Sequence, residues 1–298
     1  MSEQDTTTGR VEWITMLLIL LCYGSWVGAL FWLPLGLGVL ATGILIALHG
    51  SLTHEALHGH PFPSRIANEL MMALPLNLSI PYYRFRDLHL AHHRDSNLTD
   101  PYDDPESNYL DPIVWNRMPC WKQLACRINN TLLGRIVIGP LIGQARFMRD
   151  EFMGARRGDR AIWLAWALHL PGAAIVLLIV AVSPMPMWAY LIAAYLGLGL
   201  LKIRTFLEHR AHAQVRSRTV VIEDRGPLAF LFLNNSLHVV HHMNPKAPWY
   251  RLPALYYQNR ERYLAINNGY VYKSYGEVFR RYLWRAKDPV AHPLWPND

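Results

Sequence analysis

The stretch WITMLLILLCYGSWVGALFWLPLGLGVLATGILIALHGSL, residues 13–52, decides the fold class of this chain of 298 residues. It contains no Asp, Glu, Lys or Arg, and Pro34 divides it into the runs 13–33 and 34–52. A helix needs about 20 apolar residues to cross about 30 Å of hydrocarbon. Each run therefore predicts a membrane span, and a tight turn joins the two. The first run is too long for the apolar core of a signal peptide, and no cleavage site of small residues follows it.

A second pair of apolar runs lies much later, at 161–182 and 186–207, around the break Ser-Pro-Met-Pro. Neither tight turn carries Lys or Arg, so the positive-inside rule predicts that both termini and the central segment are cytosolic. The pattern predicts an all-α membrane protein with four transmembrane helices in two hairpins and a cytosolic helical cap. We expect a single domain, 1–298, with cytosolic segments 59–160 and 208–298.

The composition restricts the class of partner. The net charge of +7 favours anionic lipid or acidic proteins, but no free basic stripe with interleaved aromatic residues supports nucleic acid. The cysteines, Cys22, Cys120 and Cys126, form no CxxC pair, so neither a disulfide framework nor a zinc knuckle is expected.

Most of the 14 histidines fall in three clusters. The first is HxxxH and the others are HxxHH, so helical spacing predicts neighbouring imidazoles, with each HxxHH converging on one point. Eight imidazoles exceed the ligand number of one ion, so two ions are the economical interpretation. Imidazole suits Fe, Zn, Cu and Ni alike. The candidate ligands are His54, His58, His89, His92, His93, His238, His241 and His242. His49, His169 and His292 are interpreted as ordinary structural histidines.

The ordered boxes resemble those of the membrane fatty acid desaturase superfamily. The resemblance covers roughly residues 13–256 and includes the tail Pro-Trp-Tyr-x-Leu-Pro of the third box, at 248–253. It implies two iron ions, cycling between Fe2+ and Fe3+, that use O2 to oxidise an unactivated C–H bond. Acyl desaturation is the favoured outcome, and hydroxylation or ketolation of an acyl lipid, a carotenoid or a small amino-acid-derived substrate is the alternative.

The resemblance also implies a further ligand before the third box. His209 occupies that place, and His212, three residues on, is the reserve candidate. Thr205 stands where stearoyl-CoA desaturases have a water-binding Asn; it could hydrogen-bond a water but is no equivalent ligand. Asn234 and Asn235, just before the third box, are alternative polar neighbours. Glu55 and Glu208 are expected to orient ligand histidines by accepting a hydrogen bond from the ring nitrogen that does not bind metal.

The acidic run at 100–106 follows the second box, and its pattern allows two interpretations. A carboxylate there could orient a ligand histidine, but a solvated, proline-kinked loop is the favoured interpretation.

Two other classes of protein compete with the oxidase. His54-Glu55-Ala56-Leu57-His58 also fits the HExxH signature of zinc proteases, with Glu55 as general base. That interpretation leaves both HxxHH clusters unexplained. A haem-binding subunit would need its histidines within the spans, where only His49 and His169 lie.

Electrons must come from an external donor of ferredoxin or cytochrome type, because the sequence has no dinucleotide, iron–sulfur or cytochrome b5 motif. Two roles are open for the basic residues Arg84, Arg86, Arg94, Arg260 and Arg262: they could dock such a donor or anchor the chain on anionic lipid. The short N-terminus without a transit peptide suggests a bacterial inner membrane, with the active site in the cytosol.

Overall fold

The structure is a computed structural model that describes residues 11–295. The predicted cytosolic placement of residues 1–10 and 296–298 lies outside the described residues. Contacts divide the chain into two compact units, each assembled from separate segments. The first contains Met1–Arg86, Gly143–Leu201 and Pro245–Trp249; the second contains Asp87–Ile142, Lys202–Asn244 and Tyr250–Asp298.

Four helices are long and apolar enough to cross a membrane, which confirms the predicted all-α fold class with four spans. Their bounds lie close to the predicted ones. They are α1 (Trp13–Trp32), α2 (Leu35–Leu57), α9 (Arg160–Val182) and α10 (Met187–Thr205). The sidedness of the membrane and the cytosolic cap stay predictions.

The second helix continues past the predicted end near residue 52. It stops at His58, where Gly59 adopts φ +102°. The backbone N–H of Gly59 donates to the carbonyl of Ala56, and that of His60 donates to the carbonyl of Glu55. These are the bonds of a Schellman motif, which needs a residue such as glycine in the left-handed region. Hydropathy misses this end because the last turns of α2 carry buried polar side chains.

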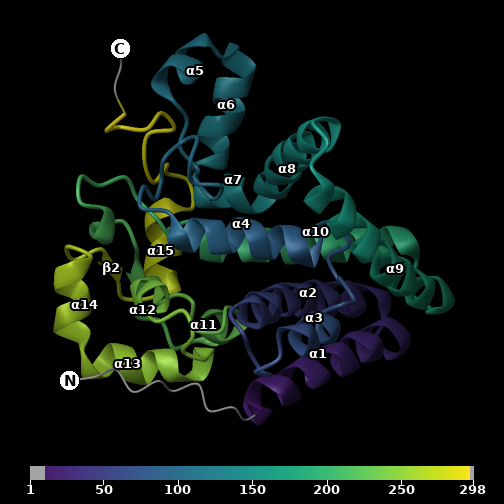
Figure 1. Cartoon of the computed structure of the whole chain (residues 1–298). Coiled ribbons are helices and arrows are strands. Elements are labelled where there is room, and N and C mark those ends of the chain that lie inside the picture. The colour runs from purple at the N-terminus through teal and green to yellow at the C-terminus, as the bar shows by residue number, and fades with distance from the viewer. Residues whose placement is uncertain (1–10, 296–298) are drawn as a thin grey trace. The chain divides into compact units, whose positions relative to one another are not determined.

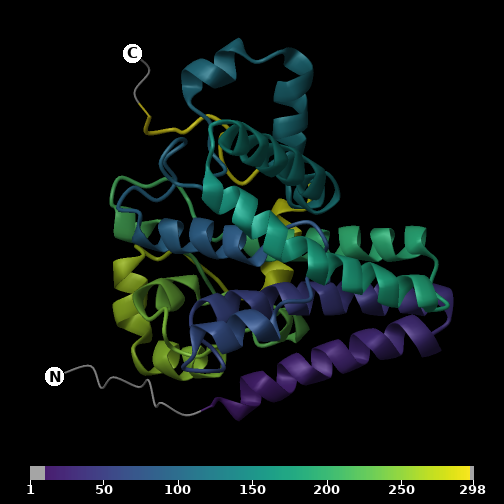
Figure 2. The same ribbon diagram turned by 45° about the vertical axis from the view of Figure 1, so that its right-hand side comes forward.

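Helices α1 and α2 pack side by side in opposite directions (Figures 1 and 2). The Cys22 thiol donates to the carbonyl of Leu45, and the Tyr23 hydroxyl lies 3.0 Å from His49 Nε2. His49 is thus a hydrogen-bonded core residue, as expected. His169 on α9 is another, because its Nε2 lies 3.0 Å from the carbonyl oxygen of Leu78.

The core of the first unit joins these helices. Trp26 and Leu30 of α1 meet Ile46 of α2, and α9 and α10 contribute Val176 and Tyr190. The remaining buried members of this cluster are Leu76, Val180, Met185, Ala189 and Ala194. The Tyr190 hydroxyl donates to the carbonyl of Leu76 at 2.7 Å, which satisfies a polar group in an otherwise apolar interior. The unit also holds α3 (Arg65–Met71) and most of α8 (Gly139–Arg156).

Gly172 on α9 permits a close approach between backbones. A Cβ atom there would lie 2.1 Å from the carbonyl oxygen of Ala73. We expect Gly172→Ala to destabilise the fold by about 1–3 kcal/mol, the usual cost of overpacking a core. Thermal unfolding in detergent measures this effect. Gly24→Ala on α1 is the control, because a Cβ there meets no atom within 4 Å. Equal midpoints for the two variants would contradict the prediction.

The second unit is built from short helices and one small parallel sheet. Strand β1 (Val221–Ile222) pairs with β2 (Val271–Tyr272), with Val221 opposite Val271. Helix α4 (Tyr82–Arg94) enters this unit at Asp87. The other elements are α5 (Pro112–Arg117), α6 (Cys120–Asn129), α7 (Leu132–Val137), η1 (Val215–Ser217), α11 (Pro227–Leu231), α12 (His238–Met243), α13 (Leu252–Gln258), α14 (Arg260–Ile266) and α15 (Tyr275–Tyr282). The short helix η2 (Trp249–Arg251) begins at the last residue of a first-unit segment and continues in the second unit.

Candidate metal centre

Two helices of the second unit carry the two HxxHH boxes. The second box forms the last turns of α4, and the third box forms almost all of α12. His89, His92, His238 and His241 are buried, with at most 2% of each residue exposed. Imidazoles in such surroundings need partners for their ring nitrogens, because an unpaired buried polar atom is costly.

Four imidazoles form the larger group of the second unit: His92, His209, His238 and His242. Their ligating atoms all lie within 4.8 Å of one another. Nε2 of His209 lies 2.9 Å from that of His92 and 3.1 Å from that of His238. His242 Nε2 is 3.1 Å from His238 Nε2. The four rings therefore aim one nitrogen each at a common point.

The same unit brings together His89, His93 and His241, whose ligating atoms also lie within 4.8 Å of one another. His93 and His241 face each other through Nε2 atoms 3.0 Å apart. These three imidazoles form the smaller group. The second unit thus contains two separate groups of ring nitrogens.

The expectation that each HxxHH box converges on one point is wrong. Box residues i and i+4 enter one group, and residue i+3 enters the other. In α4 the pair is His89 and His93, while His92 is the single residue; in α12 the single residue is His241. Successive helical residues are about 100° apart, so i and i+4 differ by about 40° whereas i+3 and i+4 differ by about 100°. The three rings of one box therefore cannot share one point, and each helix serves both groups.

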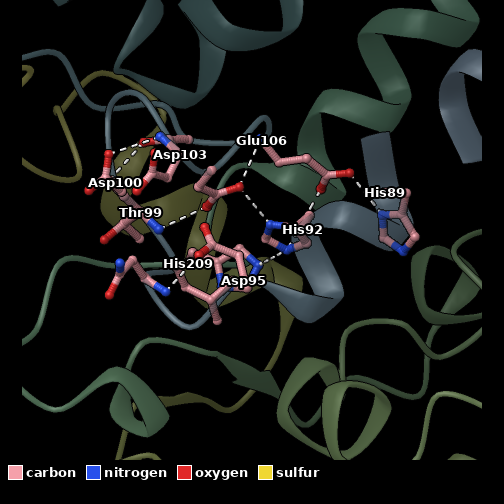
Figure 3. A network of polar contacts seen from close by, with 12 residues as sticks. His89, His92, Asp95, Thr99, Asp100, Asp103, Glu106 and His209 are labelled. Atoms are coloured by element: carbon pink, nitrogen blue, oxygen red, sulfur yellow. Dashed lines mark hydrogen bonds and ion pairs between the residues drawn. The ribbon is translucent and has the colours of Figure 1, made fainter. Parts of the chain in front are cut away.

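The acidic run after the second box is part of the site, so its interpretation as a solvated loop is wrong. His92 Nδ1 donates to Asp104 at 2.7 Å, and His89 Nδ1 donates to Glu106 at 2.8 Å (Figure 3). Asp104 is only 1% exposed. It also accepts hydrogen bonds from the backbone N–H groups of Thr99 and Glu106. The signal in the sequence was the group of carboxylates within 17 residues of the box, where the prolines bend the chain back.

The neighbouring imidazoles of His89 and His92 favour the ionised form of the Glu106 carboxylate. Its burial alone would raise its pKa, but the neighbouring His89 and His92 and the hydrogen bond from His89 hold the pKa well below its usual range. Carboxylates that accept from Nδ1 fix the tautomer of a ligand histidine and increase the basicity of Nε2.

Glu208 acts on the third box through an amide. Its carboxylate accepts from Asn235 Nδ2 at 3.2 Å, and Asn235 Oδ1 in turn accepts from Nδ1 of His238 at 3.2 Å. Burial raises the pKa of Glu208, and Arg204, whose Nε is 3.2 Å away, opposes that rise. Asn235, which the sequence offered only as a polar neighbour, is therefore the residue that links Glu208 to the box.

The larger group suits a cation. Nδ1 of His92 and of His238 donates to an oxygen, so Nε2 of each neutral ring carries a lone pair. Both lone pairs point at Nε2 of His209, which can donate only one proton. A positive ion among these nitrogens removes the repulsion, and all-imidazole donors suit Fe, Zn, Cu or Ni.

The structure separates His209 from His212, the reserve candidate three residues on. Helix α10 ends at Thr205, so the three-residue spacing does not place the two rings on one side. His209 joins the larger group, whereas the ring of His212 contacts Gln214 and Asn268. The role of Thr205 as a water-holding residue stays a prediction. His292 lies 3.3 Å from the Thr99 hydroxyl, as a structural histidine should.

Three of the five arginines considered for docking an acidic donor are neutralised within their own units. Arg84 pairs with Glu151 at 2.8 Å, and Arg86 pairs with Glu69 at 2.9 Å. Arg260 pairs with Glu223. These contacts leave less positive charge for an acidic partner than the sequence indicates.

In the first unit, the HxxxH box ends α2. The rings of His54 and His58 have centroids 4.8 Å apart, as expected for residues one turn apart. Glu55 beside them accepts a hydrogen bond from the backbone N–H of Trp249 at 3.0 Å. The carboxylate thus fixes the segment Pro245–Trp249, which follows the third box.

This contact provides a test that distinguishes an oxidase from a zinc protease, in which Glu55 would be the general base. A general base loses its function in Glu55→Gln, but a glutamine oxygen still accepts from Trp249 N–H. We expect Glu55→Gln to retain oxidase activity within about tenfold of the original chain, and Glu55→Leu to lose more because it leaves that N–H unsatisfied. Turnover of the two purified variants checks this. Equal, complete loss in both would contradict the positioning role.

The chain has four helices of membrane length and groups of imidazoles that could bind metal ions. These features indicate an integral membrane protein with a candidate metal site. The chain belongs to the fatty acid desaturase family, whose model matches residues 30–274. It is therefore an O2-using oxidoreductase of the desaturase and hydroxylase superfamily, and the family uses iron. A similar protein is a beta-carotene ketolase from Paracoccus sp., 26% identical over 233 residues that cover 74% of this chain and 76% of the ketolase.

Proposed function

We propose that the chain desaturates an acyl chain, or a similar lipid-like substrate, at two iron ions held by histidines. The observation that carries this proposal is the pair of imidazole groups in the second unit, in a chain of the desaturase family. Bound iron would supply the activation of O2 that oxidation of an unactivated C–H bond requires.

Nine histidines are the proposed ligands. The larger group already offers four, and the smaller group of the second unit offers three. The remaining two proposed ligands are His54 and His58 of the HxxxH box at the end of α2 in the first unit. The nine are His54, His58, His89, His92, His93, His209, His238, His241 and His242.

The surrounding residues hold the ligands ready for the ions. Asp104 and Glu106 keep a proton on Nδ1 of His92 and His89, and Asn235 does so for His238. With that proton on Nδ1, Nε2 is the nitrogen of each neutral ring that is left to bind metal, and the hydrogen bond orients it. This preorganisation lowers the cost of assembling the site.

The remaining parts of the proposal concern electrons and location. An external donor of ferredoxin or cytochrome type supplies the electrons, since desaturation with O2 consumes two from outside the substrate. Positive charge outside the two tight turns supports a cytosolic site, and we place the chain in a bacterial inner membrane.

A second candidate function is ketolation or hydroxylation of a carotenoid. The observation that favours it is the similarity to the beta-carotene ketolase of Paracoccus sp.. The same histidine groups serve both reactions, because the product depends on how the substrate is held.

The test uses the whole chain, expressed with iron in two bacterial hosts. One host makes saturated and monounsaturated acyl lipids, and the other makes beta-carotene. Mass spectrometry of extracts detects either a loss of two hydrogens from an acyl chain or added oxygen on the carotenoid. His241→Ala is the inactive control. New alkenes support the first proposal, oxygenated carotenoid supports the second, and bound zinc without either product overturns both.

A further inference from the structure

Helix α6 presents an apolar stripe that the described residues do not cover. Trp121 is 68% exposed, Leu124 is 57% exposed and Ile128 is 45% exposed. Their spacing of three and four residues places them on one face of the helix. No residue of α6 is buried. A stripe of this kind indicates a site of interaction rather than a water-facing surface.

Cations border the stripe on both sides. With about 100° per residue, Lys122 lies roughly 100° from Trp121 in one direction, and Arg127 lies roughly 60° from Leu124 in the other. Lys122 Nζ is 5.3 Å from the Trp121 ring, and the Arg127 guanidinium is 5.5 Å from the ring of Trp115 on α5. Such long side chains cover an aromatic surface while their charges reach polar surroundings.

The charge of the neighbouring sequence is entirely positive. Residues 112–149 contain no Asp or Glu. In α5 and α6 they carry Arg117, Lys122 and Arg127, whereas Arg135 is buried, and Arg146 and Arg149 belong to the first unit and pair with Asp150. A second copy of the chain seated on the same face would oppose cations with cations, because such a contact is self-complementary. Phospholipids with anionic headgroups complement the charge and accept the apolar side chains.

We propose that α6 is an interfacial helix that inserts Trp121, Leu124 and Ile128 into the headgroup region of an anionic bilayer. A tryptophan at the boundary, an apolar face and flanking cations are the features of helices that lie in this plane. The second unit then has a membrane contact of its own, in addition to the spans of the first unit.

A nitroxide on α6 tests the proposal in the full-length protein, reconstituted in nanodiscs that contain phosphatidylglycerol. Cys120→Ser and Cys126→Ser remove the accessible thiols, and Cys22 is only 1% exposed. The label is placed by Leu124→Cys on the stripe and by Lys122→Cys as an exposed control in the same turn. We expect the ratio of O2 to Ni-EDDA accessibility to be severalfold higher at 124 than at 122.

Two results of the accessibility measurement would overturn the proposal. If Ni-EDDA reaches both positions equally, the stripe faces water. If both reagents are excluded from 124 and the labels broaden one another, the occupant is a second copy. Exchanging phosphatidylglycerol for phosphatidylcholine, or combining Lys122→Glu with Arg127→Glu, should lower the ratio at 124. An unchanged ratio in both experiments would refute the anionic-lipid assignment.

Discussion

Replacement of His209 by alanine is expected to remove about one iron atom per chain and to lower turnover by at least about 100-fold. His209 Nε2 lies 2.9 Å from His92 Nε2 and 3.1 Å from His238 Nε2, so it is central to the larger group. Loss of a residue that only supports a ligand already costs about 10–100-fold in metal affinity or activity, and loss of the ligand itself should cost no less. Elemental analysis and turnover of the purified protein measure the two effects.

His212→Ala is the matched control for this variant. The residue lies three positions later and contacts Gln214 and Asn268 rather than the imidazole groups. Iron content and turnover should stay near those of the original chain. The assignment of His209 is wrong if the two variants lose iron equally, or if only His212→Ala loses it.

Asp104→Asn should have the second largest effect, a fall of roughly 10–100-fold in iron affinity or turnover. The carboxylate accepts from His92 Nδ1 at 2.7 Å in a fully buried setting. An asparagine keeps the shape but removes the negative charge, and its NH2 group can oppose the N–H of His92. Competition with a chelator, followed by elemental analysis, reports the affinity.

Asp103→Asn, at the adjacent residue, is the control for Asp104→Asn because it removes the same charge from an exposed position. It should leave the iron affinity unchanged, because the aspartate contacts no histidine in the hydrogen bonds of the described residues. Similar losses in both variants would show that general electrostatics of the acidic run, rather than the bond to His92, controls the site.

Hydropathy predicted the four spans because an apolar run of about 20 residues has few other uses. The histidine boxes were visible for a similar reason, since three clusters at helical spacing are hard to explain without metal. The division of each box between two groups was also accessible from helix geometry, but it requires each residue to be placed separately around the axis.

Other features depend on contacts that spacing does not encode. Asp104 reaches His92 only because the chain turns back after α4, and Asn235 is recognised only once Glu208 lies beside it. His212 is separated from His209 because α10 ends at Thr205, which the three-residue spacing alone does not predict. Ion pairs such as that of Arg84 with Glu151, which join residues 67 positions apart, are also not encoded in the spacing.

If both imidazole groups hold an ion, as proposed, the sharing of α4 and α12 between them is expected to make metal loading cooperative. A rotation of either helix displaces nitrogens of both groups, so the first ion to bind fixes the rotation for the second. Coupling of this kind is reciprocal, because each site must assist the other by the same free energy. Titration of the metal-free protein with ferrous iron should therefore be sigmoidal, and chains that carry a single ion should be scarce throughout.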